Sequence, residues 1–278
     1  WDDFSHWLPN ARFLLTMESL PGPGLPPPPS QHGTYPPGMA LVTYAVAMVA
    51  GPAGLVSLPE TAAPAMSVLL FGSLAALLAP RLQGATVGGW GAAALALGCA
   101  IWANPGFVPR LVFTNYGDAP TAALLGIAAL LALQAVERRD PWSVAQAAFA
   151  LAGVTNVKQT GFVLAAIALA AAGLMILFER NMPRLRALGL LALAALPSLL
   201  AWALWRRHAA FATGGFTIAP LATWAWDLAP QTLGSMGRVA FSKAPYTIAI
   251  LASAVAGLLA AWRGRQDALT RACLLFAA

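Results

Sequence analysis

Apolar residues in this chain gather in long runs that short polar breaks separate. A helix needs roughly 20 apolar residues to cross a bilayer. Judged by that length, the candidate spanning segments are 39–58, 63–80, 84–104, 119–136, 142–157, 161–178, 186–205 and 244–262. Alanine and glycine dominate these runs, which favours close contact between helices. The pattern predicts an all-α fold, a polytopic bundle of transmembrane helices.

Residues 1–38 follow a different pattern. Between residues 4 and 20, apolar side chains recur at the i, i+3, i+4, i+7 spacing of an amphipathic helix, at Phe4, Trp7, Leu8, Ala11, Leu14 and Leu15. An aromatic helix of this kind is expected to lie in the plane of the membrane interface. The proline-rich segment 21–30 then predicts a stiff, extended connector. We therefore divide the chain into an extracytoplasmic loop, residues 1–38, and a transmembrane helical region, residues 39–278.

Composition excludes a soluble globular protein. The chain is 59% hydrophobic and only 9% charged, whereas a soluble domain is about 25% charged. The net charge of +6 rests on basic residues in short connections between apolar runs. An excess of basic residues distributed in this way determines the orientation of the helices in the membrane and does not indicate nucleic-acid binding. Cys99 and Cys273 lie in apolar runs without metal-ligand spacing, so we interpret them as packing residues.

The two ends of the chain indicate a fragment. The sequence begins at Trp1 without an initiator methionine, and it stops inside an apolar run. We expect at least one further helix before Trp1 and more after Ala278. The lack of a targeting signal therefore carries no information about localisation.

Arginine placement predicts how the helices are oriented, because cytoplasmic connections are enriched in Lys and Arg. If helices alternate from residue 119 onward, three groups of arginines share one side, which should be cytoplasmic: Arg138 and Arg139, then Arg180, Arg184 and Arg186, then Arg263 and Arg265. The extracytoplasmic side receives Asp118, Lys158 and the segment 206–243. Arg206 and Arg207 run against this tendency, so they need a counter-anion or another helix register.

Three apolar runs separate Asp3 from Asp118, so the two acids share a face only if one run does not cross. We expect 39–58 to be a re-entrant or shallow segment, because a Gly-Pro pair interrupts it and Pro59 follows it. Arg81 is then cytoplasmic, between the two remaining spans.

Two carboxylate positions are candidates for chemistry. Asp2 and Asp3 stand beside the interfacial helix, where charge is costly unless it is solvated, paired or metal-bound. Asp118 follows Asn115-Tyr116-Gly117 at the expected start of a helix. A plain helix N-cap is the alternative at both positions, because Asp favours that place and the helix dipole.

Lys158 lies in a polar island between two apolar runs, in a chain whose usual cation is arginine. A lysine at the outer end of a helix, beside hydrogen-bonding side chains, suits a phosphate ligand. A lysine that snorkels to the membrane surface is the alternative. His6 and His32 are candidates for proton transfer or ligand binding, or are simple polar fillers of the loop. The segment 206–243 is amphipathic and aromatic, so it could form a second interfacial lid.

Together these features resemble the GT-C superfamily of polytopic glycosyltransferases, within it the protein mannosyltransferase and aminoarabinose transferase group. The resemblance rests on the acidic pair Asp2-Asp3, the interfacial helix, Tyr35-Pro36-Pro37-Gly38 leading into a membrane helix, the later acid Asp118, and Lys158 in a polar break. It covers residues 1–161, after which only the alternation of helices continues it.

The resemblance implies an enzyme that moves a sugar from a polyprenyl-phosphate donor to an acceptor at the extracytoplasmic face of a bacterial inner membrane. Asp2 and Asp3 match the acidic motif of the first loop, where such acids act on the acceptor hydroxyl or bind metal, and Asp118 is the expected second-loop acid. Transfer also needs cations on the departing phosphate. The substrate-binding candidates are Lys158 first, then Arg110, Arg206 and Arg207, with His6, His32 and Tyr35.

Several alternatives stay open at this point. A Mg or Mn ion on Asp2, Asp3 or Asp118 would suit oxygen ligands, but members of the superfamily differ in needing one. The acceptor could be a glycan, a lipid or a protein that enters from the aqueous face, while the lipid tail of the donor lies between helices in the bilayer. No nucleic acid is expected as a partner. A transporter or flippase, or a non-catalytic envelope-assembly protein, is the competing function.

Overall fold

The computed structural model describes residues 7–30, 32–50, 59–82, 88–102, 117–178, 183–209 and 221–242, together with 247, 248, 251, 254 and 255. Regular structure within these residues is entirely helical, without a strand. The predicted all-α class is therefore confirmed. The apolar runs between residues 39 and 205 each contain a helix, whereas the run at 244–262 lies almost wholly outside the described residues.

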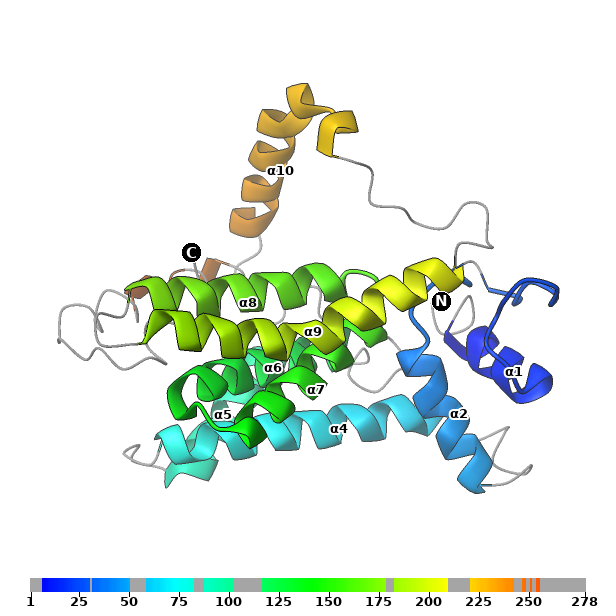
Figure 1. Ribbon diagram of the computed structural model, residues 1–278, viewed down its shortest axis with the longest axis horizontal. Coiled ribbons are helices and arrows are strands. Elements are labelled where there is room, and N and C mark those ends of the chain that lie inside the picture. The colour runs from blue at the N-terminus through cyan, green and yellow to red at the C-terminus, as the bar shows by residue number, and fades with distance from the viewer. Residues whose placement is uncertain are drawn as a thin grey trace.

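Four consecutive helices form the centre of the molecule. They are α6 (Asp118–Arg138), α7 (Pro141–Val157), α8 (Gly161–Phe178) and α9 (Arg184–His208). Short connections join them, so neighbours in the chain pack antiparallel, and Figure 1 shows them lying along the long axis of the molecule. Small side chains line their contacts: Ala128, Ala132, Ala135 and Ala147 are fully buried. The helix backbones can therefore approach closely.

Helix α4 (Pro59–Leu78) runs along α6, and the turn η2 (Ala79–Leu82) leads towards α5 (Gly88–Trp102). Gly126 of α6 contacts Leu74, since a Cβ there would lie 3.2 Å from the leucine side chain. Arg81 approaches Glu137 at 4.0 Å, which places Arg81 at the same end of the bundle as Arg138. This is the placement that the arginine pattern predicted.

Helix α1 (Leu8–Met17) has the predicted amphipathic character. Leu8, Ala11 and Leu14 are buried, and the last two pack against Ala40 of α2 (Gly38–Ala50). The helix ends at Glu18 in a left-handed conformation, and residues 18–30 contain no helix. The sequence therefore located the helix and the non-helical connector, but the connector is not fully extended, because it contains a turn closed by the hydrogen bond from the Leu25 N–H to the Gly22 carbonyl.

Helix α2 lies at the end of the bundle where α9 terminates (Figure 1). Its 13 residues rise about 20 Å, which is less than the roughly 30 Å of a hydrocarbon core. Gly38 stands directly against the end of α7, because a Cβ at this position would overlap the carbonyl of Asn156. Residues 51–58 lie outside the described residues, so the shallow or re-entrant course of the 39–58 run stays a prediction.

Within the part of the chain that the structure describes, two helices, α6 and α9, are long and apolar enough to cross a membrane. The apolar helical segments Gly38–Val49, Ala65–Arg81 and Gly161–Leu177 are shorter. The apolar window of α6 is 72% buried, whereas that of α9 is 28% buried. The outward side of α9 carries a row of exposed leucines, Leu193, Leu196, Leu199, Leu200 and Leu204.

The predicted lid at 206–243 belongs to more than one element. Residues 206–208 end α9, and later residues form η5 (Leu221–Thr223), η6 (Trp226–Leu228) and α10 (Ala229–Ser242). Figure 1 shows α10 projecting away from the bundle. Leu233 and Met236 on one side of α10 are exposed, and Arg238 on the other side donates to Ser235 at 3.2 Å. Its amphipathic pattern is therefore present, while a role as a lid stays a prediction.

Candidate functional site

The centre of the candidate site is an ion pair between the two residues that the sequence singled out in the helical region. Asp118 is the first residue of α6, and Lys158 directly follows α7. Because these helices are antiparallel, residues 40 positions apart meet at one end of the bundle. Lys158 Nζ donates to Asp118 Oδ1 at 2.5 Å, with the side chains 24% and 60% exposed, respectively.

Asp118 does not occupy the N-cap position of α6, and its functional role stays a prediction. Gly117 occupies the N-cap position and makes no side-chain cap, while Asp118 lies in the first turn and bonds across to Lys158. The lysine uses one of its three N–H donors in this contact, and Asp118 Oδ2 makes no hydrogen bond within the described residues. Both charged groups therefore keep bonding capacity towards solvent.

The backbone around Lys158 is held tightly. Lys158 is extended, and its carbonyl accepts a hydrogen bond from the Gly161 N–H at 2.9 Å. Gly161 lies so close to α7 that a Cβ would overlap the Val154 carbonyl. Glycine is thus required at the turn between α7 and α8, and the turn fixes the direction from which Lys158 reaches the pair.

The loop that precedes α2 is anchored beneath this ion pair. Trp7 is 5% exposed and packs with Met39 and Val157. A Cβ on Gly117 would lie 2.9 Å from the Trp7 ring. Trp7 therefore touches the residue before Asp118 and the residue before Lys158, which brings the first loop and the pair together.

A row of aromatic rings continues from Trp7. Tyr35 meets Trp7 edge to face, with ring centroids 5.9 Å apart, and His32 stacks on Tyr35 at 4.7 Å. Two of the predicted ligand-binding residues, His32 and Tyr35, thus lie in one stack. This stack extends from the buried Trp7 to the surface of the loop.

The carboxyl end of α9 holds the same loop from the other side. Trp205 Nε1 donates to the carbonyl of Thr34 at 2.9 Å, and His208 Nε2 lies 2.7 Å from the carbonyl of Pro21. The two residues of the first contact are 171 positions apart in the chain, and those of the second are 187 positions apart. They fix the proline-rich connector against the helical bundle.

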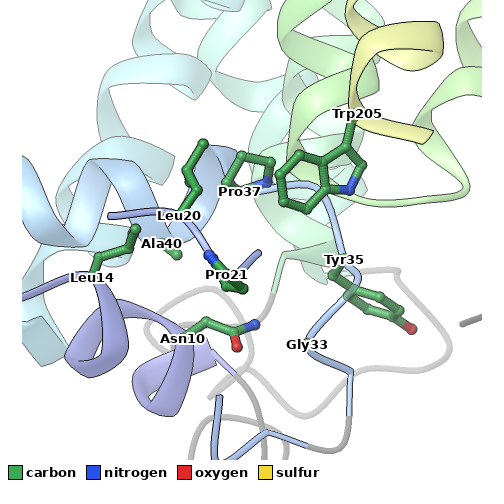
Figure 2. A pocket seen from close by; sticks show the side chains of 9 residues that line it. All are labelled: Asn10, Leu14, Leu20, Pro21, Gly33, Tyr35, Pro37, Ala40 and Trp205. Carbon is green, nitrogen blue, oxygen red and sulfur yellow. The ribbon is translucent and has the colours of Figure 1, made fainter. Parts of the chain in front are cut away.

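A pocket opens between this loop and α9, as Figure 2 shows. It is shallow and open to solvent, with room for little more than one water molecule. Its lining is mainly apolar and comes from α1, the connector, the start of α2 and the end of α9: Asn10, Leu14, Leu20, Pro21, Gly33, Tyr35, Pro37, Ala40 and Trp205. Tyr35 thus belongs both to the aromatic row and to the pocket wall.

Arg206 and Arg207 end α9 at the same end of the molecule. The Arg206 guanidinium lies 5.8 Å from the centre of the Trp202 ring, and Trp202 stacks on Phe162 at 4.5 Å. An aromatic face stabilises a cation there. Arg207 is exposed in the last turn of the helix. Both arginines can therefore contribute positive charge at this end.

Four predicted site residues, Asp2, Asp3, His6 and Arg110, lie outside the described residues. No group of three or more His, Cys, Asp or Glu side chains that could hold a metal occurs in the part of the chain that the structure describes. Since the metal prediction depends chiefly on Asp2 and Asp3, it stays a prediction.

Sequence reasoning missed three residues at this end, namely Asn10, Trp205 and His208. The last two carried a signal: Trp202, Trp205 and His208 recur every third residue and so share one side of α9. Asn10 is the single polar residue among the buried positions of α1. A polar residue on an otherwise apolar helix face was the indication available for it.

Comparisons with protein-family models, with curated proteins and with solved structures found no match to this chain. The functional argument therefore rests on the geometry and chemistry of the residues described above.

Proposed function

We propose that this chain is a multi-pass membrane glycosyltransferase that uses a polyprenyl-phosphate-linked sugar at the extracytoplasmic face of a bacterial inner membrane. The observation that carries the proposal is the Asp118–Lys158 pair, set at one end of an apolar bundle beside an aromatic loop. Such a site offers an anion and a cation side by side. The sugar of the donor must separate from its phosphate and form a bond to the oxygen of an acceptor hydroxyl.

Exposed apolar side chains support the membrane part of this proposal. They cover several helices of the bundle: Val68 and Leu69 on α4, Phe149 on α7, Ile167 and Leu174 on α8, and Leu196 and Leu200 on α9. A soluble monomer rarely exposes contiguous apolar surface on this scale. A hydrocarbon environment would cover these faces.

The distribution of charge favours an enzyme over a transporter. The stretches 61–80, 119–136, 141–157, 159–178 and 187–205 contain no Asp, Glu, Lys or Arg. Transporters place ionisable groups near the middle of the membrane. Here the charged residues gather at helix ends, as a reaction at one membrane face requires.

In the proposed reaction, the bond between the sugar C1 and the phosphate oxygen breaks, and the phosphate keeps the electron pair. The acceptor oxygen bonds to C1, and its proton passes to a carboxylate. Lys158 stabilises the charge that develops on the departing phosphate, with Arg206 and Arg207 as further cations. Asp118 orients Lys158 and can present Oδ2 to the acceptor, while the resemblance assigns the base role to Asp2 or Asp3.

A divalent metal does not fit the described residues well. They supply one carboxylate at this site, Asp118, and its Oδ1 already holds the Lys158 ammonium. A metal ion on that oxygen would displace a cation that the reaction needs. We therefore route no step through a metal at Asp118.

The test compares Lys158→Met with Arg81→Met in the full-length protein. Arg81 lies 4.0 Å from Glu137 at the other end of the bundle, so Arg81→Met is a control for the loss of one basic residue away from the site. An exposed pair contributes at most about 1 kcal/mol to stability, so neither change should unfold the protein. Loss of a transition-state donor lowers a rate by about 100-fold or more.

Membranes that contain each variant receive polyprenyl-phosphate-linked radiolabelled mannose, glucose or arabinose, and release of polyprenyl phosphate is measured. We expect the wild type and Arg81→Met to consume one donor, and Lys158→Met to lose this activity. The charge-reversed double variant, Asp118→Lys with Lys158→Asp, should stay inactive, because it restores the pair but moves the cation. Activity retained in Lys158→Met would remove Lys158 from the mechanism.

A second outcome would favour the competing function. If the wild type moves a polyprenyl lipid across the membrane without releasing polyprenyl phosphate from any donor, the protein is a flippase and the enzyme proposal is wrong.

A further inference from the structure

Five arginines gather at the end of the bundle that lies opposite the Asp118–Lys158 pair: Arg81, Arg138, Arg139, Arg184 and Arg186. The end of α6 and the start of α9 meet there, since Val136 and Ala187 belong to one buried cluster. Two carboxylates adjoin these arginines within the described residues, Glu137 and Asp140. This end of the molecule is therefore strongly positive.

Local structure does not favour a cation at three of these positions. Arg139 caps α6 with a φ of 57°, in the left-handed region where glycine is the preferred residue. Arg184 and Arg186 stand in the first turn of α9, which contains no acidic residue, and the helix dipole is positive at that end. All three side chains are exposed. Cations kept at unfavourable surface positions indicate that an anion from outside the fold compensates them.

The surface of α9 next to Arg186 is apolar. Seven residues make almost two full turns, so Arg186, Leu193 and Leu200 lie on one side of the helix, and both leucines are exposed. Gly189 lies between Arg186 and Leu193 on this side, and a Cβ there would meet nothing within 4 Å. Along this face, a cation is followed by bare helix backbone and then by exposed apolar side chains.

A phospholipid presents complementary groups in the same order. Its phosphate is anionic, its glycerol is compact, and its acyl chains are apolar. At 1.5 Å per residue, Leu193 and Leu196 lie about 10 and 15 Å from Arg186 along the helix axis, and one leaflet contains about 15 Å of hydrocarbon. Both leucines therefore lie at the depth of the acyl chains when Arg186 meets the headgroup. A soluble anion would leave them uncovered.

We infer that this face of α9 binds one anionic phospholipid. The phosphate lies against Arg184 and Arg186, and the glycerol covers Gly189. The acyl chains pack on the exposed leucines Leu193 and Leu196. The inference rests on the membrane location in the proposed function and does not depend on sugar transfer.

The test measures lipid binding by the full-length protein in an uncharged detergent. Dioleoyl phosphatidylglycerol, which has a net negative charge, is compared with dioleoyl phosphatidylcholine, which has the same chains and no net charge. Native mass spectrometry counts the bound lipids. We expect the wild type to retain one phosphatidylglycerol in preference. The double variant Arg184→Gln, Arg186→Gln should bind it about 30-fold more weakly, because each arginine near an anionic headgroup contributes a factor of about 5 in affinity.

The charge-matched control is the double variant Arg12→Gln, Arg238→Gln. Both residues are exposed, and neither belongs to α6 or α9, so this control should keep phosphatidylglycerol binding. Loss of Arg184 and Arg186 removes two cations from the positive end of the α9 dipole and should leave Tm unchanged or raise it. A lower Tm with unchanged lipid binding would show that these arginines serve the fold, and the inference would be wrong.

A second variant separates one bound lipid from general attraction to a positive surface. Gly189→Phe keeps every charge but fills the open space beside Arg186, whereas Gly72→Phe fills similar open space on α4. We expect Gly189→Phe to weaken phosphatidylglycerol binding about 4-fold or more, the equivalent of contact with one methylene group. Gly72→Phe should have no effect.

Several results would overturn the inference. They are equal binding of the two lipids by the wild type, an equal loss of binding in the charge-matched control, and full binding in Gly189→Phe. Displacement of the lipid by glycerol 3-phosphate would also overturn it, because the anion alone would then be recognised.

Sugar transfer is assayed separately, because Lys158 lies at the opposite end of the bundle. Lipid binding without transfer keeps this site and contradicts only the proposed function. Transfer that depends on Lys158, without selective lipid binding, contradicts only the lipid site.

Discussion

Gly117, the residue before Asp118, lies against the Trp7 ring of the first loop. Its backbone has right-handed helical angles, φ −68° and ψ −7°, so an alanine would fit the backbone without strain. The obstacle is the neighbouring ring, since a Cβ would lie 2.9 and 3.0 Å from two atoms of Trp7. Because Trp7 is buried, the ring has little room to move.

We therefore expect Gly117→Ala to destabilise the protein by about 1–3 kcal/mol, the usual cost of overpacking a close-packed site. The matched control is Gly72→Ala in α4, where a Cβ meets nothing within 4 Å. In a helix interior that change should be neutral or stabilise by up to about 1 kcal/mol. Thermal unfolding in nanodiscs measures the stability change in both variants. Equal changes in the two variants would show that close packing of Gly117 on Trp7 is not required.

Some residues of the site could be predicted from the sequence, and others could not. Asp118 and Lys158 were candidates because each is a charge at the edge of an apolar run, and their pairing followed from the antiparallel packing of α6 and α7. Asn10 and Trp205 carried weaker signals, a polar residue on an apolar helix face and a ring spaced every third residue along α9. Their roles come from contacts between the first loop and α9, and spacing within one helix does not reveal contacts of that range.

At the scale of one element, α7 begins with a strong cap. Asp140 Oδ1 accepts from the Ser143 N–H at 2.9 Å, and its Oδ2 accepts from the Ser143 hydroxyl at 2.6 Å. These bonds, the side-chain bond first, hold the pKa of Asp140 below its ordinary value of 3.8. The cap therefore favours the folded state most when Asp140 is ionised.

The direction of the pH effect follows from the lowered pKa. Asp140 stabilises the protein above the pKa of the unfolded chain, and this contribution is lost as pH falls below about 4 towards the folded pKa. The variant Asp140→Asn is a suitable comparison because asparagine also caps helices but does not ionise, so this variant should lack the pH-dependent component. We expect the Tm difference between wild type and Asp140→Asn to shrink as pH falls through that range, and a constant difference would contradict the assignment.

Other elements show where local sequence was sufficient. Apolar spacing predicted α1, and proline content predicted the connector that follows it. The limits of α2 were less predictable, because the apolar run from 39 to 58 continues past the last described residue of the helix, Ala50. The approach of Gly38 to Asn156 and the packing on α1 place α2 across the end of the bundle.

For the whole molecule, the proposal of a multi-pass protein places the two ends of the bundle on opposite sides of the membrane. Gln159 adjoins Lys158 at one end, and Arg139 lies in the basic connection at the other. Single cysteines at these positions, with Cys99 and Cys273 replaced by alanine, can be labelled in intact cells by a membrane-impermeant maleimide. We expect labelling at position 159, and at position 139 only after permeabilisation, because basic connections stay in the cytoplasm.

Labelling of both positions from outside would mean that α7 does not cross the membrane, and the multi-pass proposal would then be wrong. Equal labelling of both positions in permeabilised cells is the control for reactivity.

The sequence by itself determined the helical class, the apolar character of the bundle and the amphipathic helix in the first loop. These properties depend on composition and on periodicity over neighbouring residues, which a linear pattern contains. Only the tertiary structure decided that Lys158 pairs with Asp118, that Trp7 packs beneath them, and that Asn10 and Trp205 line one pocket. Such contacts join residues far apart in the chain, and they exist because close packing of small side chains brings particular helix ends together.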